Sequence, residues 1–99
     1  MKSQKQLTKS ISIIIPIYNE EKTIMATLKN ILFIFQQHKI NFEIIIIIDI
    51  APNDNSLKII KSLSAQYDEI KYFSRTGKQG IASAIYLGME NSRKELTMI

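Results

Sequence analysis

The 99-residue chain contains no cysteine and no valine, and it has no apolar run long enough to span a bilayer. Without cysteine, disulfide bonds, zinc fingers and thiol catalysis are excluded. The longest purely aliphatic run, residues 44–48, is far shorter than the ~20 residues that a membrane-spanning helix needs. The opening residues also lack the apolar core of a signal peptide. We therefore expect a cytoplasmic protein, or one that is peripheral to a membrane.

The formal net charge of +4 is concentrated at the start of the chain. Lys2, Lys5 and Lys9 lie in the polar segment MKSQKQLTKS, and the remainder of the chain carries a charge of only about +1. Such a segment is typical of a solvated terminus, and contact with an anionic membrane or a nucleic acid is the less favoured alternative. We predict a flexible basic leader over residues 1–10, a single domain over residues 11–99, and no nucleic-acid partner.

Short apolar segments alternate with helical patterns along the rest of the chain. The spacing predicts strands at 11–17, 41–49, 70–74 and 95–99, and helices at about 19–38, 57–67 and 80–92. The second strand, NFEIIIIID, is apolar at consecutive positions, which is typical of a parallel strand covered on both faces. Right-handed crossovers would connect these elements. The sequence therefore predicts an α/β fold, a Rossmann-like three-layer parallel sheet in the order β-α-β-α-β-α-β.

Chemically useful side chains lie at or just beyond the carboxyl ends of the predicted strands, where ligands of open α/β sheets bind. The first strand delivers Pro16, Tyr18, Asn19 and Glu20, the second delivers Asp49, and the third delivers Ser74 and Arg75. An aromatic ring can pack against a nucleobase, a carboxylate can accept hydrogen bonds from a base or ribose, and a guanidinium can meet a diphosphate. We expect these groups to meet at one edge of the sheet.

Several of these residues also have a simpler interpretation. Asn19 followed by Glu20 and Glu21 is a favourable helix start. Asp49 could be an ordinary turn residue, and Tyr18 could merely cover the core. After the second strand, Asn53 or Asp54 could cap the next helix. The loop RTGKQG lacks the Walker spacing, and no G-x-G-x-x-G follows the first strand, so neither a P-loop nor a dinucleotide fingerprint is present.

Three ordered segments resemble the amino-terminal half of family 2 glycosyltransferases of the GT-A fold. They are IIIPIYNEEKTI, FEIIIIIDIAPNDNSLKII and KQGIASAIYLGM, and the resemblance covers residues 11–99. The last segment is especially similar to dolichyl-phosphate mannose synthase-like members, whose small-residue helix pattern is matched by Gly80, Ala82, Ala84 and Gly88. The resemblance implies transfer of a sugar from a nucleotide-diphospho-sugar, linked to UDP or GDP, onto a lipid phosphate or another acceptor.

The resemblance also implies a nucleotide-sugar-binding role for particular residues. Pro16, Tyr18 and Glu20 match the P-x-Y-N-E segment of the family, which lines the nucleotide site. Asp49 matches the first acid of the D-D-G-S-x-D-x-T segment, Asp54 the later acid and Ser56 the closing hydroxyl. Arg75 and Lys78 lie in the stretch that approaches the nucleotide and its phosphates.

The chain departs from the family pattern in two places. Ile50 and Ala51 replace the second acid and the glycine of the D-D-G-S segment, so we expect weakened or altered nucleotide recognition. The strand matching LTMI leads in the family into a D-x-D motif, whose acids hold a divalent cation (Mg²⁺ or Mn²⁺). We expect the full family domain to need that cation, but this chain to lack its ligands and any catalytic residue.

These departures make the isolated chain a truncated domain in our interpretation, one that is incomplete for catalysis. Exposed strand edges of a truncated sheet recruit other chains, so we also expect self-association. The main alternative is a non-catalytic remnant or interaction module that keeps the fold without the activity. A flavodoxin-like receiver is a third possibility, which Glu20, Glu21 and Asp49 imitate only in part.

Overall fold

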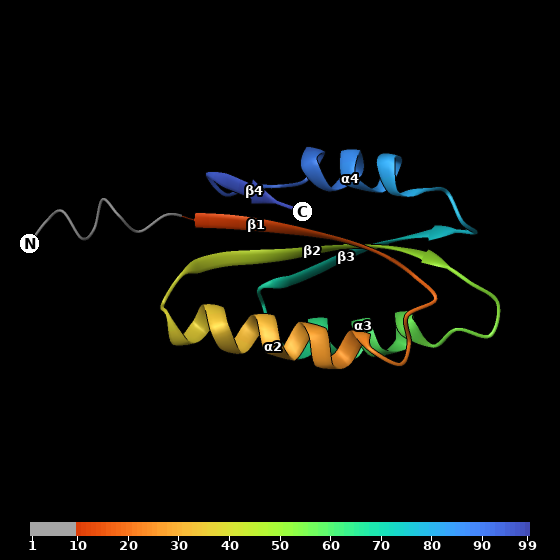
Figure 1. Ribbon diagram of the computed structural model, residues 1–99, viewed down its shortest axis with the longest axis horizontal. Helices are drawn as coiled ribbons and strands as arrows, with labels where there is room; N and C mark the ends of the chain where they lie inside the picture. Colours follow the sequence, from red (N-terminus) through yellow and green to blue (C-terminus); the bar gives the residue numbers. More distant parts are fainter. Residues whose placement is uncertain (1–9) are drawn as a thin grey trace, which may run out of the picture.

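The computed structural model describes residues 10–99, in which strands and helices alternate along the chain (Figure 1). The strands are β1 (Ser10–Tyr18), β2 (Asn41–Ile50), β3 (Ile70–Thr76) and β4 (Leu96–Met98). The helices are α2 (Ile24–Gln37), α3 (Ser56–Gln66) and α4 (Ile81–Glu90). The predicted basic leader lies outside the described residues except for Ser10, which opens β1. Among the described residues, none of the helices combines the length and hydropathy needed to cross a bilayer.

All four strands are parallel and lie in the order β3-β2-β1-β4. Figure 1 shows α2 and α3 on one face of this sheet and α4 on the other. The predicted Rossmann-like three-layer parallel sheet is therefore confirmed. Its strands and helices occur in the predicted order, with boundaries that differ by a few residues.

Strand β2 is one of the two inner strands of the sheet. It pairs with β1 on one edge and β3 on the other, and every residue from 42 to 49 is buried. Alternate side chains of β2 contribute to the larger core under α2 and α3, whose buried members are Ile13, Ile17, Ile24, Leu28, Leu32, Phe42, Ile44, Ile46, Ile48, Ile60, Leu63 and Ile70. On the other face, Ile45 and Ile47 pack against Ala84 of α4. Burial on both faces explains why β2 shows no alternation of apolar and polar residues.

A buried carboxylate ties the α4–β4 connection to the amino-terminal ends of the strands. Glu43 accepts hydrogen bonds from Ser12 Oγ at 2.6 Å, Lys71 Nζ at 2.7 Å and the Arg93 N–H at 2.7 Å. The Lys94 N–H in turn donates to Ser12 Oγ at 3.1 Å. Burial would raise the pKa of Glu43, but the hydrogen bonds from Lys71, Ser12 and Arg93 outweigh it and hold the pKa below its ordinary value. Glu43 is thus an ionised anchor on the face of the sheet that α4 covers.

Helix α2 begins later than the sequence interpretation of Asn19 as a helix start implied. Helix α2 begins at Ile24 with Thr23 as its N-cap, so the interpretation of Asn19 as the helix cap is wrong. Asn19 instead has a φ of 57°, a left-handed conformation that asparagine tolerates better than most residues. The physical reason is that the chain must turn sharply on leaving β1 before the helix can begin.

At the start of α3, the prediction that Asn53 or Asp54 is the helix cap is wrong, because the N-cap position belongs to Asn55. Asp54 has a local role instead: its Oδ1 accepts hydrogen bonds from the Ser56 N–H at 3.1 Å and Ser56 Oγ at 2.7 Å. Asn53, the alternative cap, lies one residue earlier at a φ of 58°. The segment that matches the family's later acid and closing hydroxyl therefore organises the first turn of α3.

Candidate functional site

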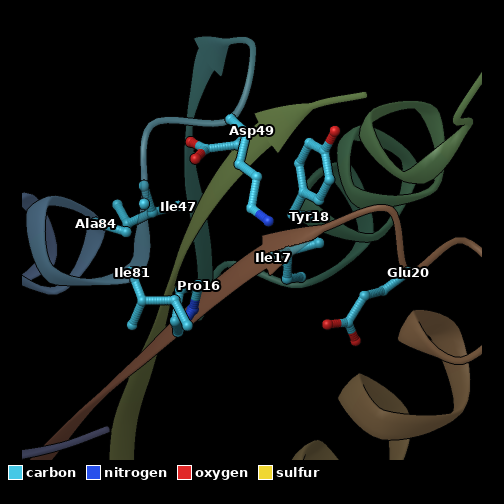
Figure 2. A pocket seen from close by; sticks show the side chains of 10 residues that line it. Pro16, Ile17, Tyr18, Glu20, Ile47, Asp49, Ile81 and Ala84 are labelled. Atoms are coloured by element: carbon cyan, nitrogen blue, oxygen red, sulfur yellow. The ribbon is translucent and has the colours of Figure 1, made fainter. Parts of the chain in front are cut away.

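A pocket of about 240 Å³ opens at the carboxyl ends of β1 and β2, beside the first turn of α4 (Figure 2). Its lining residues are Pro16, Ile17, Tyr18, Glu20, Ile47, Asp49, Lys78, Gly80, Ile81 and Ala84. Five of the six predicted site residues are among them. The sixth, Arg75, is not part of the lining, but it contacts Asp49 and Gly80, which are. The parallel register explains the gathering, because Tyr18 is the partner of Asp49 and Asp49 is the partner of Arg75 on the next strand.

The end of β1 delivers three of these side chains. Pro16 is accommodated within the strand because β4 pairs with β1 only as far as Ile13, so at Pro16 β1 has a strand on one side only. Two residues later Tyr18 projects into the pocket lining with 36% of its surface exposed. The left-handed turn at Asn19 then redirects the chain, and Figure 2 shows Glu20 reaching in from the loop that follows.

Asp49 is a buried and fully engaged carboxylate. Arg75 Nε donates to its Oδ1 at 2.7 Å, Arg75 Nη2 donates to its Oδ2 at 3.1 Å, and the Gln79 N–H donates to Oδ2 at 2.7 Å. Burial would raise the pKa of Asp49, but the hydrogen bonds from Arg75 and the Gln79 N–H outweigh it and hold the pKa below its ordinary value. Asp49 is therefore an anion whose charge is already matched within the protein.

Arg75 joins β3 to the start of α4. Besides its two bonds to Asp49, it donates from Nη1 to Ser83 Oγ at 2.8 Å and from Nη2 to the Gly80 carbonyl at 3.0 Å. Only 12% of its side chain is exposed. The guanidinium is thus placed behind Asp49 and Gly80, where it fixes parts of the pocket wall.

The rim of the pocket carries a cation and a carboxylate. Lys78 Nζ lies 5.4 Å from the centroid of the Tyr18 ring, within the range of a cation–π contact. The Glu20 carboxylate is exposed and has no hydrogen-bond partner among residues 10–99. Glu20 also lines a neighbouring hollow of about 550 Å³ between the loops that follow β1 and β2. Lys78 and Glu20 are therefore the charged groups of the pocket that remain available to a ligand.

Glu21, adjacent to Glu20, has a different role. Its Oε1 accepts the Asn55 N–H at 2.9 Å, and its Oε2 accepts Asn55 Nδ2 at 3.2 Å. The backbone hydrogen bond from Asn55, followed by the side-chain one, lowers the pKa of Glu21. Glu21 thus ties the loop after β1 to the start of α3, as an acid near a helix N-terminus should.

The residues described do not fit a divalent cation. Mg²⁺ and Mn²⁺ favour several oxygen ligands, typically carboxylates and water. Within residues 10–99 there is no group of three acidic, histidine or cysteine side chains that could hold a metal ion. Of the two carboxylates that line the pocket, Asp49 is the buried one, and it forms an ion pair with Arg75.

Ile50 and Ala51, which replace the second acid and the glycine of the D-D-G-S segment, do not line the pocket. Ile50 is 37% exposed, whereas Ala51 is buried.

The remaining polar groups of the site surround an apolar slot. A slot of this kind suits a flat ring that carries N–H donors and is attached to an anion. Its volume is below the roughly 300–1,000 Å³ of sites for drug-sized ligands, so it accommodates one part of a larger ligand.

Half of the lining was not predicted from the sequence. These residues are Ile17, Ile47, Gly80, Ile81 and Ala84. Ile81 lines the pocket from the first turn of α4, where 66% of its surface is exposed. A recognisable signal was Gly80, the glycine just before a helix pattern, whose φ of 98° is accessible mainly to glycine.

Comparisons with known proteins agree with this architecture. The sequence profile of the family described as "Glycosyl transferase family 2" matches residues 12–99. A solved structure of the mannosyltransferase PcManGT from Pyrobaculum calidifontis, in complex with GDP-Man and Mn²⁺, is similar to the chain with a TM-score of 0.75 and 19% sequence identity. The match covers 91% of this chain and 26% of that chain, so this chain spans about a quarter of the length of that protein.

Proposed function

The chain belongs to glycosyl transferase family 2, and we propose that its pocket binds the nucleoside part of a nucleotide-diphospho-sugar. The fold is the Rossmann-like arrangement of a GT-A glycosyltransferase. The observation that carries the proposal is the convergence of three side chains on one apolar slot at the carboxyl ends of parallel strands: Tyr18 from the end of β1, Glu20 from the loop after it, and Lys78 from the loop before α4.

Each of these groups has a use in nucleotide recognition. The Tyr18 ring offers a flat apolar surface for a base, the free Glu20 carboxylate can accept from base or ribose donors, and Lys78 can meet a phosphate. UDP- and GDP-linked sugars are the proposed ligands; the complex of PcManGT with GDP-Man supports the second. A lipid phosphate is the proposed acceptor of the family reaction, in keeping with the resemblance of the α4 segment to dolichyl-phosphate mannose synthase-like enzymes.

Titration of the 99-residue chain with UDP, GDP and their sugars tests the proposal. Because the pocket is small, we expect a dissociation constant on the order of 1 mM, which NMR or calorimetry can measure. Tyr18→Ala should abolish the signal, whereas Tyr86→Ala, which removes an aromatic ring from the exposed face of α4, should not. Equal binding by the Tyr18→Ala variant would contradict the proposal.

For the chain by itself we propose binding without sugar transfer. The support is the lack, among residues 10–99, of a side-chain group fit to hold a metal ion. Incubation with GDP-mannose or a UDP-sugar, a lipid phosphate, and Mn²⁺ or Mg²⁺ should yield no glycosylated lipid. Metal-dependent transfer by the purified chain would show this part of the proposal to be wrong.

A non-catalytic interaction module is the second candidate. It is favoured by the pairing of Asp49 with Arg75, which satisfies a carboxylate that sequence reasoning assigned to the ligand. Under this alternative, no nucleotide should perturb the chain at millimolar concentration, so the same titration separates the two candidates.

A further inference from the structure

We propose that Arg75 is a positioning residue of the nucleotide pocket, which fixes Asp49 and Gly80 in the wall without touching the ligand. This inference rests on the proposed function and assigns to Arg75 a role different from the phosphate contact expected from the sequence. The positioning role follows from where the guanidinium donates its hydrogen bonds, how its charge is matched, and what it holds.

The first argument is the hydrogen bonding of the guanidinium. Each of its three nitrogens donates within the protein: Nε and Nη2 to Asp49, Nη2 also to the Gly80 carbonyl, and Nη1 to Ser83 Oγ. These bonds use four of the five guanidinium N–H groups, so a two-point contact with a phosphate would have to displace at least one of them. Since bonds between a guanidinium and a carboxylate in a two-point geometry are among the stronger hydrogen bonds of proteins, the exchange gains little.

The second argument is charge. Asp49 neutralises Arg75 at close range, so the pair presents little net charge to an incoming diphosphate. Lys78 has no carboxylate within ion-pairing distance among residues 10–99, and its ammonium lies at the pocket rim beside Tyr18. Lys78 is therefore the residue that attracts a phosphate electrostatically.

The third argument is the backbone that Arg75 holds. Gly80 has a φ of 98° and a ψ of 155°, a conformation open essentially to glycine alone, and its carbonyl accepts from Arg75. The Gln79 N–H is bound to Asp49, which Arg75 orients. Gly80 and the next residue, Ile81, both line the pocket. Arg75 thus connects the ends of β2 and β3 to the wall formed by the start of α4.

A comparison of nucleosides with nucleoside diphosphates tests the inference. NMR titrations of the full chain would use uridine, guanosine, UDP and GDP against wild type, Arg75→Lys and Lys78→Met. Lysine keeps the charge but, with one ammonium group, cannot reach Asp49, Gly80 and Ser83 together. We expect Arg75→Lys to weaken nucleoside and diphosphate binding by the same factor, on the order of tenfold. Lys78→Met should weaken diphosphate binding alone.

One control and one further test variant separate positioning from a loss of folding. Ser12→Ala removes hydrogen bonds at the opposite end of the strands and should leave the affinities unchanged. Ser83→Ala removes one of the anchors of Arg75 and should weaken nucleoside and diphosphate binding equally, by about two- to threefold. If Arg75→Lys does not fold, the Ser83→Ala variant decides the question by the same comparison.

Two further readouts need no ligand. Arg75→Lys should speed hydrogen exchange of the Gln79 amide and move the carbon-13 titration of the Asp49 carboxyl toward higher pH. A loss confined to the diphosphates, with the Gln79 amide and the Asp49 titration unchanged, would overturn the positioning role. If wild type binds none of the four ligands, the proposed function is wrong, and the two ligand-free readouts then decide whether Arg75 fixes this wall.

Discussion

Gly88 of α4 lies directly over Ile14 of β1, so closely that a Cβ added to Gly88 would stand 2.5 Å from Ile14 Cγ2. Real Cβ contacts essentially never fall below 3.0 Å. A glycine within a helix is about 1 kcal/mol less favourable than alanine, so its presence here needs a packing reason. The reason is the close approach of α4 to the sheet, which places Gly80 and Ile81 beside the carboxyl ends of the strands.

Gly88→Ala should therefore destabilise the protein despite the better helix propensity of alanine. We expect a loss of about 1–3 kcal/mol in the free energy of unfolding, the range for overpacked cores, measured by urea denaturation. In an Ile14→Ala background the clashing atoms are gone, and the same substitution should become neutral or stabilising. An additive double-mutant cycle would contradict the contact as the cause.

Acid should weaken the fold through Glu43. Its pKa in the folded protein lies below the ordinary value of 4.5, so the ionised carboxylate stabilises the protein fully above that pH. The contribution is lost as the pH falls through the folded-state pKa. Glu43→Gln should cost about 1.5–3 kcal/mol at pH 7 and much less at pH 3, as followed by urea denaturation at both pH values.

The exposed Glu90→Gln variant is the control for this experiment, and its stability should follow that of wild type at both pH values. The lowered pKa of Asp49 acts in the same direction, so the Glu43→Gln variant should keep part of the loss of stability in acid. An undiminished difference between Glu43→Gln and wild type at pH 3 would show that shape, not ionisation, makes Glu43 important.

The fold could be predicted from the sequence because local signals and the global architecture agree. Isoleucines at consecutive positions of β2 indicated a strand covered on both faces, and β2 is buried in that way. Element ends were harder, since a left-handed turn at Asn19 leaves no unambiguous mark in a sequence that also suits a helix start. The sequence also contained a signal for the partners of Glu43. A lone carboxylate inside an apolar strand must be paired when it is buried, so hydrogen-bond partners for Glu43 could have been expected.

The candidate site could be predicted only as a set of positions. Strand order and register determine which residues share an edge, and these brought Tyr18, Glu20 and Asp49 together at one pocket. Hydrogen-bond partners depend on side-chain directions that spacing does not show. The engagement of Asp49 by Arg75 therefore emerged only from the structure.

We propose that the chain self-associates through β4, one of the two edge strands of the described sheet. Leu96 and Met98 are 49% and 47% exposed there. Apolar edge strands recruit other chains, and lysine on such an edge opposes pairing. A Leu96→Lys, Met98→Lys variant should sediment as a monomer at concentrations where wild type associates. Phe33→Lys, which alters an exposed apolar site on α2, should not change the association; a monomeric wild type would refute the proposal.

Glu20 and Glu21 are adjacent in the chain but should respond differently to neutralisation. The Glu20 carboxylate lines the pocket and has no hydrogen-bond partner within the described residues, so Glu20→Gln should weaken nucleotide binding by about three- to tenfold while leaving the unfolding temperature unchanged. Glu21→Gln loses charge from its contact with Asn55 and should lower the unfolding temperature without changing affinity. NMR titration with UDP and GDP, together with thermal denaturation, measures both effects. The two variants form a matched pair, and equal loss of affinity in both would show that the loop as a whole, rather than the Glu20 carboxylate, determines recognition.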